Sequence, residues 1–154
     1  MLLRKLTEAD YPAMLALYRE LDEMHVKARP DYFVHRDEVY PREHYEAAIV
    51  DPECLLMGAF DEAGVMMGLV RATLWKESGM VKTMKTVCLD NIFVAREFRR
   101  RGIASALYRN VERWAKEQGA ARIDLHVWDF NKDALALYRT FGMTPQRYVM
   151  EKNL

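Results

Sequence analysis

Three consecutive arginines, Arg99, Arg100 and Arg101, stand directly before the small residues Gly102 and Ala104, where an apolar segment gives way to a predicted helix. The first backbone N–H groups of a helix have no partner inside it, and the helix dipole adds positive charge there, so this end suits a pyrophosphate. Small side chains let the backbone approach phosphate oxygens, with which arginines can pair. The sequence contains neither Gly-Lys-Ser/Thr nor Gly-x-Gly-x-x-Gly. A solvated basic turn is the alternative interpretation.

Two motifs resemble those of one enzyme family. Arg99-x-x-Gly102-x-Ala104, after an apolar strand, resembles the acetyl-coenzyme A signature of the GNAT superfamily of N-acetyltransferases. The later sequence Asn131-x-x-Ala134-x-x-Leu137-Tyr138, followed by Gly142, resembles the motif in which the family's Asn contacts the cofactor and its Tyr protonates the departing thiolate. The resemblance covers most of residues 86–142 in detail, and the rest of the chain only through the order of strands and helices.

The resemblance implies a site for acetyl-coenzyme A. In the family two strands splay apart at residues 92–94, and their free backbone groups take up the pantetheine arm much as they would an added strand. The cofactor-binding residues implied in this way are Ile92, Phe93, Val94, Arg99, Arg100, Arg101, Gly102, Ile103, Ala104, Ser105 and Asn131. The chain departs from the family pattern at Ala104, where many members have Gly, and at Met143, where Phe is commoner.

An alkylamine acceptor needs a base. With a pKa near 10.4 it is neutral in roughly one molecule per few thousand at pH 7, a cost of about 4.6 kcal/mol. The resemblance places an acidic residue, usually Glu, at position 90 in some polyamine-acetylating members, so Asp90 is the predicted base, through a bridging water because Asp is shorter. A structural Asp bound to backbone or to a cation is the alternative. His126 and Glu20 are alternative bases.

Tyr138 is the predicted acid. A phenol of pKa about 10 is protonated at neutral pH and can give a proton to a thiolate of pKa near 8.5 at a cost of about 2 kcal/mol. Helical packing is its alternative role. The Val94 amide is the predicted donor to the carbonyl oxygen on which negative charge develops. Neither Cys54 nor Cys88 lies in a motif of a nucleophile, so direct transfer without a covalent enzyme intermediate is expected.

These residues need a sheet and helices to hold them. Apolar periodicity predicts strands near residues 2–6, 55–60, 65–74, 86–94, 122–128 and 145–150. It predicts helices from Thr7 through Met24, over residues 42–50, over 102–117 and over 132–141. The order indicates one α/β domain over residues 1–154. We expect a mixed, mostly antiparallel, GNAT-like sheet of six or seven strands, splayed between two central strands and flanked by about four helices.

Composition narrows the class of protein. The 154 residues carry 23 Lys+Arg and 23 Asp+Glu, which argues against non-specific nucleic-acid binding. No apolar stretch suggests a membrane span or a secretory signal, so a cytoplasmic protein is expected. The two cysteines, expected to be reduced and buried, form no metal-binding spacing, and no metal site is predicted.

The charges are unevenly distributed. Residues 1–70 contain 7 basic and 14 acidic side chains, whereas residues 71–154 contain 16 and 9. The halves can attract each other within one fold, or the basic half can hold an anionic cofactor while the acidic half meets a cationic substrate. A loop at residues 29–41 with Tyr32, Phe33 and Tyr40 is predicted to border the acceptor pocket.

The sequence thus predicts an N-acetyltransferase that moves the acetyl group of acetyl-coenzyme A onto a primary amine of a small cationic substrate. A second hypothesis is an acyl-coenzyme A sensor without catalysis, and a third is transfer to a protein or peptide. The resemblance also implies a possible homodimer. The identity of the amine is left open.

Overall fold

The computed structural model describes residues 1–77, 79 and 82–154. In chain order the elements are β1 (Leu2–Lys5), a 3₁₀ turn (Glu8–Asp10), α1 (Tyr11–Ala28), α2 (Arg42–Val50), β2 (Cys54–Phe60), β3 (Met66–Glu77), β4 (Met84–Val94), a 3₁₀ turn (Arg96–Phe98), α3 (Ile103–Glu117), β5 (Arg122–Asp124) and α4 (Lys132–Thr140). The four predicted helices are therefore confirmed, the first of them after a 3₁₀ turn.

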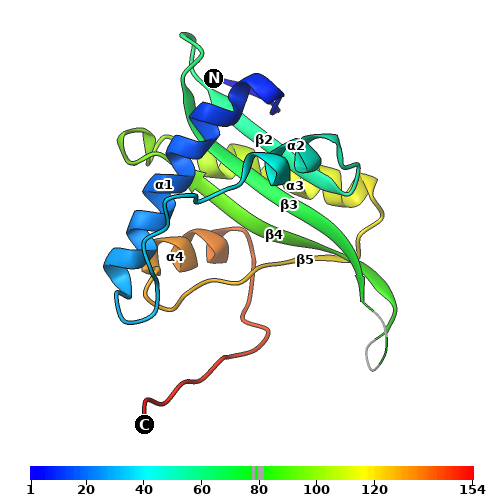
Figure 1. The fold of residues 1–154 in the computed structure, drawn as a ribbon. Helices are drawn as coiled ribbons and strands as arrows, with labels where there is room; N and C mark the ends of the chain where they lie inside the picture. Colours follow the sequence, from blue (N-terminus) through cyan, green and yellow to red (C-terminus); the bar gives the residue numbers. More distant parts are fainter. Residues whose placement is uncertain (78, 80–81) are drawn as a thin grey trace.

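The strands form one sheet in the order β1-β2-β3-β4-β5. Neighbours from β1 to β4 are antiparallel, and β5 is parallel to β4. The mixed, mostly antiparallel sheet is confirmed, but the expected number of six or seven strands is wrong, because the part of the chain that the structure describes forms five (Figure 1).

β4 and β5 separate early. They pair only at Thr86↔Arg122, Val87↔Ile123 and Cys88↔Asp124, whereas β4 continues to Val94. The later half of β4 therefore pairs with β3 on one edge, and no strand among the described residues pairs with its other edge. The expected splay is present. The strand predicted over residues 122–128 ends at Asp124 for the same reason, since beyond that point the chain has left the edge to which it was paired.

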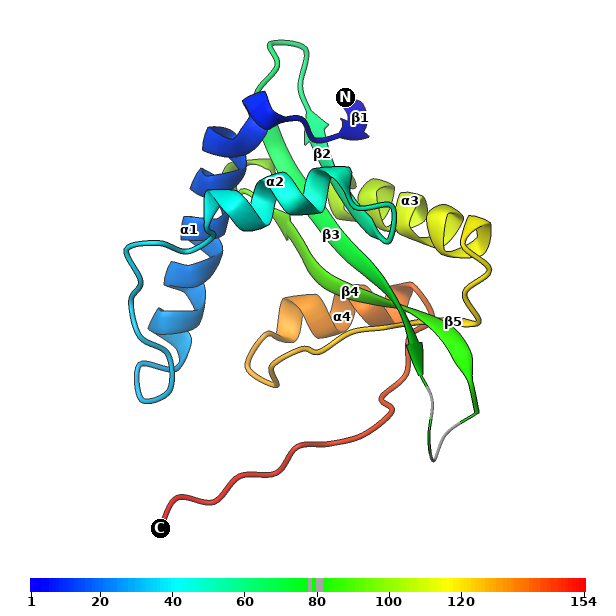
Figure 2. The same ribbon diagram turned by 45° about the vertical axis from the view of Figure 1, so that its right-hand side comes forward.

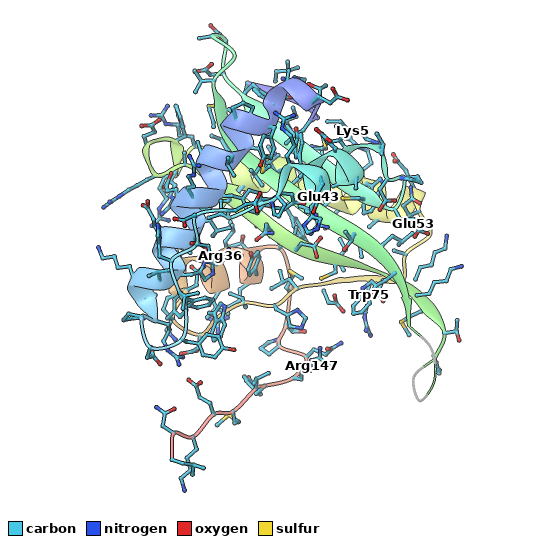
Figure 3. All side chains as sticks on the ribbon, in the orientation of Figure 1. Lys5, Arg36, Glu43, Glu53, Trp75 and Arg147 are labelled. Atoms are coloured by element: carbon cyan, nitrogen blue, oxygen red, sulfur yellow. The ribbon has the colours of Figure 1, made fainter. Side chains whose placement is uncertain are left out.

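The strand predicted over residues 145–150 is wrong. This segment has no regular structure, and Tyr148, Val149 and Met150 are 81%, 91% and 88% exposed. Figures 1 and 2 show it running away from the sheet, and Arg147 is labelled on it in Figure 3. A short segment with apolar residues forms a strand only where another strand pairs with it, and no strand of the described chain pairs with this segment.

Each face of the sheet has its own core. On one face the predicted stripe of α3, with Leu107 and Val111 fully buried, packs on Val70 and Val87. On the other face lie α1 and α2 (Figure 2). Their buried side chains, Met14 of α1 among them, form a second core with Leu69 of β3.

α4 lies on the α3 face. The Phe141 ring just after this helix stacks on Tyr108 of α3 with centroids 4.0 Å apart, and Tyr138 packs against the same core. The sheet thus separates a side formed by α1 and α2 from a side formed by α3 and α4.

Candidate active site

A β-bulge sets the position of Asp90. Arg71 of β3 pairs with Asn91 and Ala72 pairs with Leu89, so Asp90 is the extra residue on β4, with no partner in the register. A bulge of this kind re-aims side chains and is common beside active sites. Here Asp90 and Asn91 both turn toward the face that carries α1: Asp90 accepts from the Thr73 hydroxyl at 3.1 Å, and the Asn91 amide donates to the Tyr18 hydroxyl at 3.3 Å.

Asp90 is a half-buried carboxylate with raised basicity. Burial raises its pKa above the ordinary 3.8, while Arg71, the Thr73 hydroxyl and the Cys88 thiol act in the opposite direction. The nearest charge is the Arg71 guanidinium, whose Nη1 lies 3.5 Å from Asp90 Oδ2. A carboxylate with a raised pKa beside an open strand edge is equipped to accept a proton.

The surroundings of Asp90 contain residues that the sequence analysis did not single out as functional. Tyr18 of α1 is buried, and its ring lies 4.8 Å from that of Tyr40. Burial raises the pKa of both phenols, so they are neutral donors or acceptors. Arg71 is the single charged residue in residues 65–74, which are otherwise largely apolar. That isolation is the one feature of the sequence that could have marked Arg71 as functional. No periodicity reveals a bulge, so the grouping with Tyr18 and Asn91 could not be predicted.

The predicted phosphate-binding turn has the backbone conformation that such a site requires. Arg100 and Gly102 adopt positive φ angles of 63° and 75°. The α3 hydrogen bonds begin with Ala106 N–H donating to the Gly102 carbonyl at 3.0 Å, so the amides of residues 103–105 precede the first bond of the helix. A Cβ built on Gly102 meets no atom within 4 Å, so the space beside this residue is open. The turn therefore fits a phosphate group.

The three arginines have different roles. Arg99 Nε donates to the Val94 carbonyl at 3.0 Å, and Arg101 donates to the Glu97 carbonyl at 3.2 Å. These two hydrogen bonds hold the turn in place, and both guanidinium groups stay positively charged beside it. Arg100 is exposed, and its strained φ belongs to the turn itself.

Residues 92–94 of β4 lead into this turn. Their register with β3 is Val70↔Ile92, Leu69↔Phe93 and Gly68↔Val94, and their other edge faces the gap left by β5. The Phe93 and Val94 side chains are buried in the cores on opposite faces of the sheet, which fixes the strand. Only the backbone groups on the unpaired edge of this stretch can therefore bind a ligand.

α4 carries the two residues of the second motif. Asn131 is the N-cap, and its side-chain oxygen accepts from the Ala134 amide at 3.2 Å. Tyr138, seven residues later, is partly buried against the α3 core, and burial raises its pKa to about 12. Tyr138 thus stays protonated across the physiological range.

The two alternative bases occupy other places. Glu20 accepts from the Arg96 backbone at 3.0 Å and lies 3.6 Å from the Arg99 guanidinium, so it holds the chain leading to the phosphate turn. His126 is exposed, with its Nε2 3.3 Å from an Arg147 nitrogen. Of the three candidate bases, only Asp90 sits at the bulge.

The aromatic loop is divided between two places. Tyr40 lies with Tyr18, near Arg71, whereas Tyr32 and Phe33 pack against Trp128, with ring centroids 5.1 Å from it in both cases. The second group joins the 29–41 loop to the segment after β5. Arg36 of the same loop, labelled in Figure 3, pairs with Asp22 of α1 at 2.6 Å.

The described residues hold no group of three or more His, Cys, Asp or Glu that could bind a metal ion. None of their helices is long and apolar enough to cross a membrane. Cys54 is buried as expected, but Cys88 is only half-buried, because it faces the polar surroundings of Asp90.

Comparison with known proteins places the chain in a family. The model of the "Acetyltransferase (GNAT) family" matches residues 14–143. A thialysine N-epsilon-acetyltransferase of Sus scrofa is 37% identical over 60 residues, which are 39% of this chain and 35% of that protein. The chain thus spans about a third of the length of curated relatives of this kind.

Solved structures agree over the whole chain. A mutant of the BH1408 protein from Bacillus halodurans has a TM-score of 0.95 and 26% identity over 100% of this chain and 99% of that one. Aminoglycoside N-acetyltransferase AAC(6')-Iy, in complex with CoA, has a TM-score of 0.75 and 18% identity over 99% of this chain and 98% of its own, a likeness of fold. This chain belongs to the GNAT family of acetyltransferases, enzymes that use acetyl-coenzyme A.

Proposed function

We propose that the protein transfers the acetyl group of acetyl-coenzyme A directly to a primary amine of a small substrate, without a covalent enzyme intermediate. One observation carries this proposal: the bulge places the Asp90 carboxylate on the α1 side of β4, a few residues before the free strand edge and the phosphate turn. Cofactor and acceptor would then enter the gap from opposite sides of the sheet.

Asp90 would remove the proton from the attacking ammonium. Deprotonating an alkylamine of pKa about 10.4 at pH 7 costs about 4.6 kcal/mol, and a carboxylate whose pKa is raised accepts the proton more readily than an ordinary Asp. Thr73 and Arg71 would hold the carboxylate in place. A water between Asp90 and the amine would make up for the short side chain.

Tyr138 would give its proton to the departing thiolate. With a pKa of about 12 in the free protein, its phenol is a weaker acid than ordinary Tyr, and transfer to a thiolate of pKa near 8.5 costs about 5 kcal/mol. Hydrogen bonding between phenol and sulfur, short of full transfer, would therefore carry much of the effect. The Val94 N–H would donate to the oxygen on which negative charge develops.

The cofactor site would combine both motifs. The amides of residues 103–105 and the cationic turn would bind the pyrophosphate, the free edge at residues 92–94 would bind the pantetheine arm, and Asn131 would add a side-chain contact. The names of the relatives, a thialysine acetyltransferase and an aminoglycoside acetyltransferase, support an amine as the acceptor.

An acceptor screen tests the proposal. Thiol release from acetyl-coenzyme A would be measured with diamines, aminoglycosides, amino acids and peptides, after calorimetric titration of the cofactor. We expect cofactor binding and turnover with at least one small amine. No binding at millimolar cofactor overturns the proposal. Binding without turnover on any amine favours a sensor, and turnover confined to peptides favours a protein acetyltransferase.

A further inference from the structure

Arg71, the charged neighbour of Asp90, has hydrogen-bond donors that the described residues leave unused. Its side chain lies on the α1 side of the sheet, near Tyr18, Tyr40 and Cys54, and remains 29% exposed. A guanidinium has five N–H donors. The described residues take up only a few of them: Nη1 lies 3.5 Å from Asp90, Cys54 makes a further contact, and the buried Nε has no hydrogen-bond partner. A buried donor without an acceptor is costly, and in native proteins it calls for an explanation.

The charges next to the predicted base are balanced. Asp90 contributes one negative charge and Arg71 one positive charge, 3.5 Å apart. The groups around them, Tyr18, Tyr40 and Cys54, are neutral at pH 7, since burial raises the pKa of each. A polycationic acceptor attracted by Asp90 would therefore bring its charge against Arg71. A pair of opposite charges is best matched by a ligand that carries its own opposite pair at a similar spacing.

We infer that Arg71 binds a carboxylate of the acceptor, so that the acceptor is an amine with a carboxylate a few ångströms from the reacting nitrogen, as in an amino acid. The inference rests on the proposed function and refines it. The substrate's ammonium group lies at Asp90 and its carboxylate at Arg71, so each charge of the substrate meets the opposite charge of the protein. A carboxylate would pair with the Nη donors in the exposed part of the guanidinium group, in the paired geometry that guanidinium groups favour.

The alternative is that Arg71 only holds Asp90. The two roles differ in what they predict about the substrate. A positioning residue affects all amines alike, whereas a carboxylate-binding residue affects only acceptors that carry the carboxylate.

Matched acceptors separate the two roles. The common L-amino acids, their carboxamides and the amines that lack the carboxylate would be compared by thiol release at saturating acetyl-coenzyme A. Their binding to the CoA-loaded protein would be followed by calorimetry. For the best side chain we expect the acid to exceed its carboxamide by ~10-fold or more in kcat/KM. Arg71→Gln should reduce this ratio to about 1, mainly through the KM of the acid.

Two further variants keep the test decisive. Arg71→Lys retains the charge without the paired geometry and should keep part of the preference, which also controls for folding. Arg42→Gln removes an exposed arginine of α2 that pairs with Glu46 and lies over the Tyr11 ring, and should leave the ratio unchanged. Thermal melts would show that each variant is folded.

The outcomes distinguish this inference from the proposed function. If carboxamides or simple amines are acetylated as well as the acids, or if Arg71→Gln slows all acceptors equally, the carboxylate site is wrong while N-acetylation stands. If no acceptor is bound or acetylated although acetyl-coenzyme A binds, both are wrong.

Discussion

The two sides of the gap in the sheet are built from different groups. On the proposed cofactor side, the turn at residues 99–105 and the free edge of β4 offer backbone amides, while Arg99 and Arg101 brace the turn by donating to carbonyl oxygens. On the proposed acceptor side, the available groups are side chains: Asp90, Arg71 and Asn91 from two strands and Tyr18 from α1. The first site would therefore depend on backbone conformation, and the second on which side chains are present.

This difference predicts opposite sensitivities. Removing one functional group from a side chain should damage catalysis on the acceptor side without changing cofactor affinity. On the cofactor side, a change that disturbs backbone conformation should weaken cofactor binding, because the backbone supplies the binding groups.

The largest effect is expected for Asp90→Asn. An amide of the same shape cannot accept the proton, so kcat should fall by about 10²- to 10³-fold, while the dissociation constant of acetyl-coenzyme A changes by less than about 3-fold. Thiol release and calorimetry measure the two quantities. Asp129→Asn, at an exposed Asp that pairs with Lys132, is the matched control and should behave as wild type.

The pH profile sharpens this prediction. Asp90 works as a base only when ionised, and its pKa is raised, so kcat/KM should fall with decreasing pH at values above the ordinary 3.8. In Asp90→Asn the inflection set by this carboxylate should disappear, which leaves only the pH dependence set by the amine itself. An unchanged rate in the variant would remove Asp90 from the mechanism and return it to a structural role.

Tyr138→Phe comes next. It removes a single hydroxyl from a ring that packs against the α3 core, so the fold should persist and kcat should fall by about 10- to 100-fold. Single-turnover measurements would assign the loss to chemistry. Tyr108→Phe, in the same core, provides the control, and an equal loss in both variants would indicate a packing effect.

The division between backbone and side chains also explains what the sequence could predict. Residues 99–105 are consecutive, so spacing alone located the turn, and the helix after it is confirmed. Asp90 was named only through the family resemblance, and its partners Arg71 and Tyr18 lie 19 and 72 positions away. Their grouping depends on a bulge that leaves no period in the sequence. The strand predicted over residues 145–150 is wrong because a short apolar stretch does not guarantee a partner strand.

A change at Asp10 tests whether the start of α1 can be destabilised without an effect on cofactor binding. Its carboxylate accepts from Arg4 at 2.7 and 2.8 Å and from the Thr7 amide at 2.8 Å, just before α1 begins. Arg4 chiefly, and Thr7, lower its pKa from 3.8 to about 2. A lowered pKa stabilises the fold above pH 3.8, and the stabilisation disappears as the pH falls toward 2.

Asp10→Asn should therefore reduce the free energy of unfolding by about 2 kcal/mol at pH 7. Denaturant titrations from pH 7 to pH 2 should show the difference from wild type shrinking as the pH falls. Because α1 carries Tyr18, the acceptor KM should rise while cofactor affinity is retained. A difference that does not change with pH would show that the ion pair contributes little.

The smallest effect, and the most direct test of a site made by conformation, concerns two glycines of α3. Gly102 before the helix and Gly119 after it adopt nearly the same left-handed φ, 75° and 69°, and a Cβ at either meets no atom within 4 Å. Alanine at each position should therefore cost about 1 kcal/mol of stability from the same backbone strain. Only Gly102 lies where the phosphate is expected, so Gly102→Ala should also weaken acetyl-coenzyme A binding by ~10-fold, and Gly119→Ala should not. Equal cofactor affinity in the two variants, at equal loss of stability, would mean that the phosphate does not approach the backbone there.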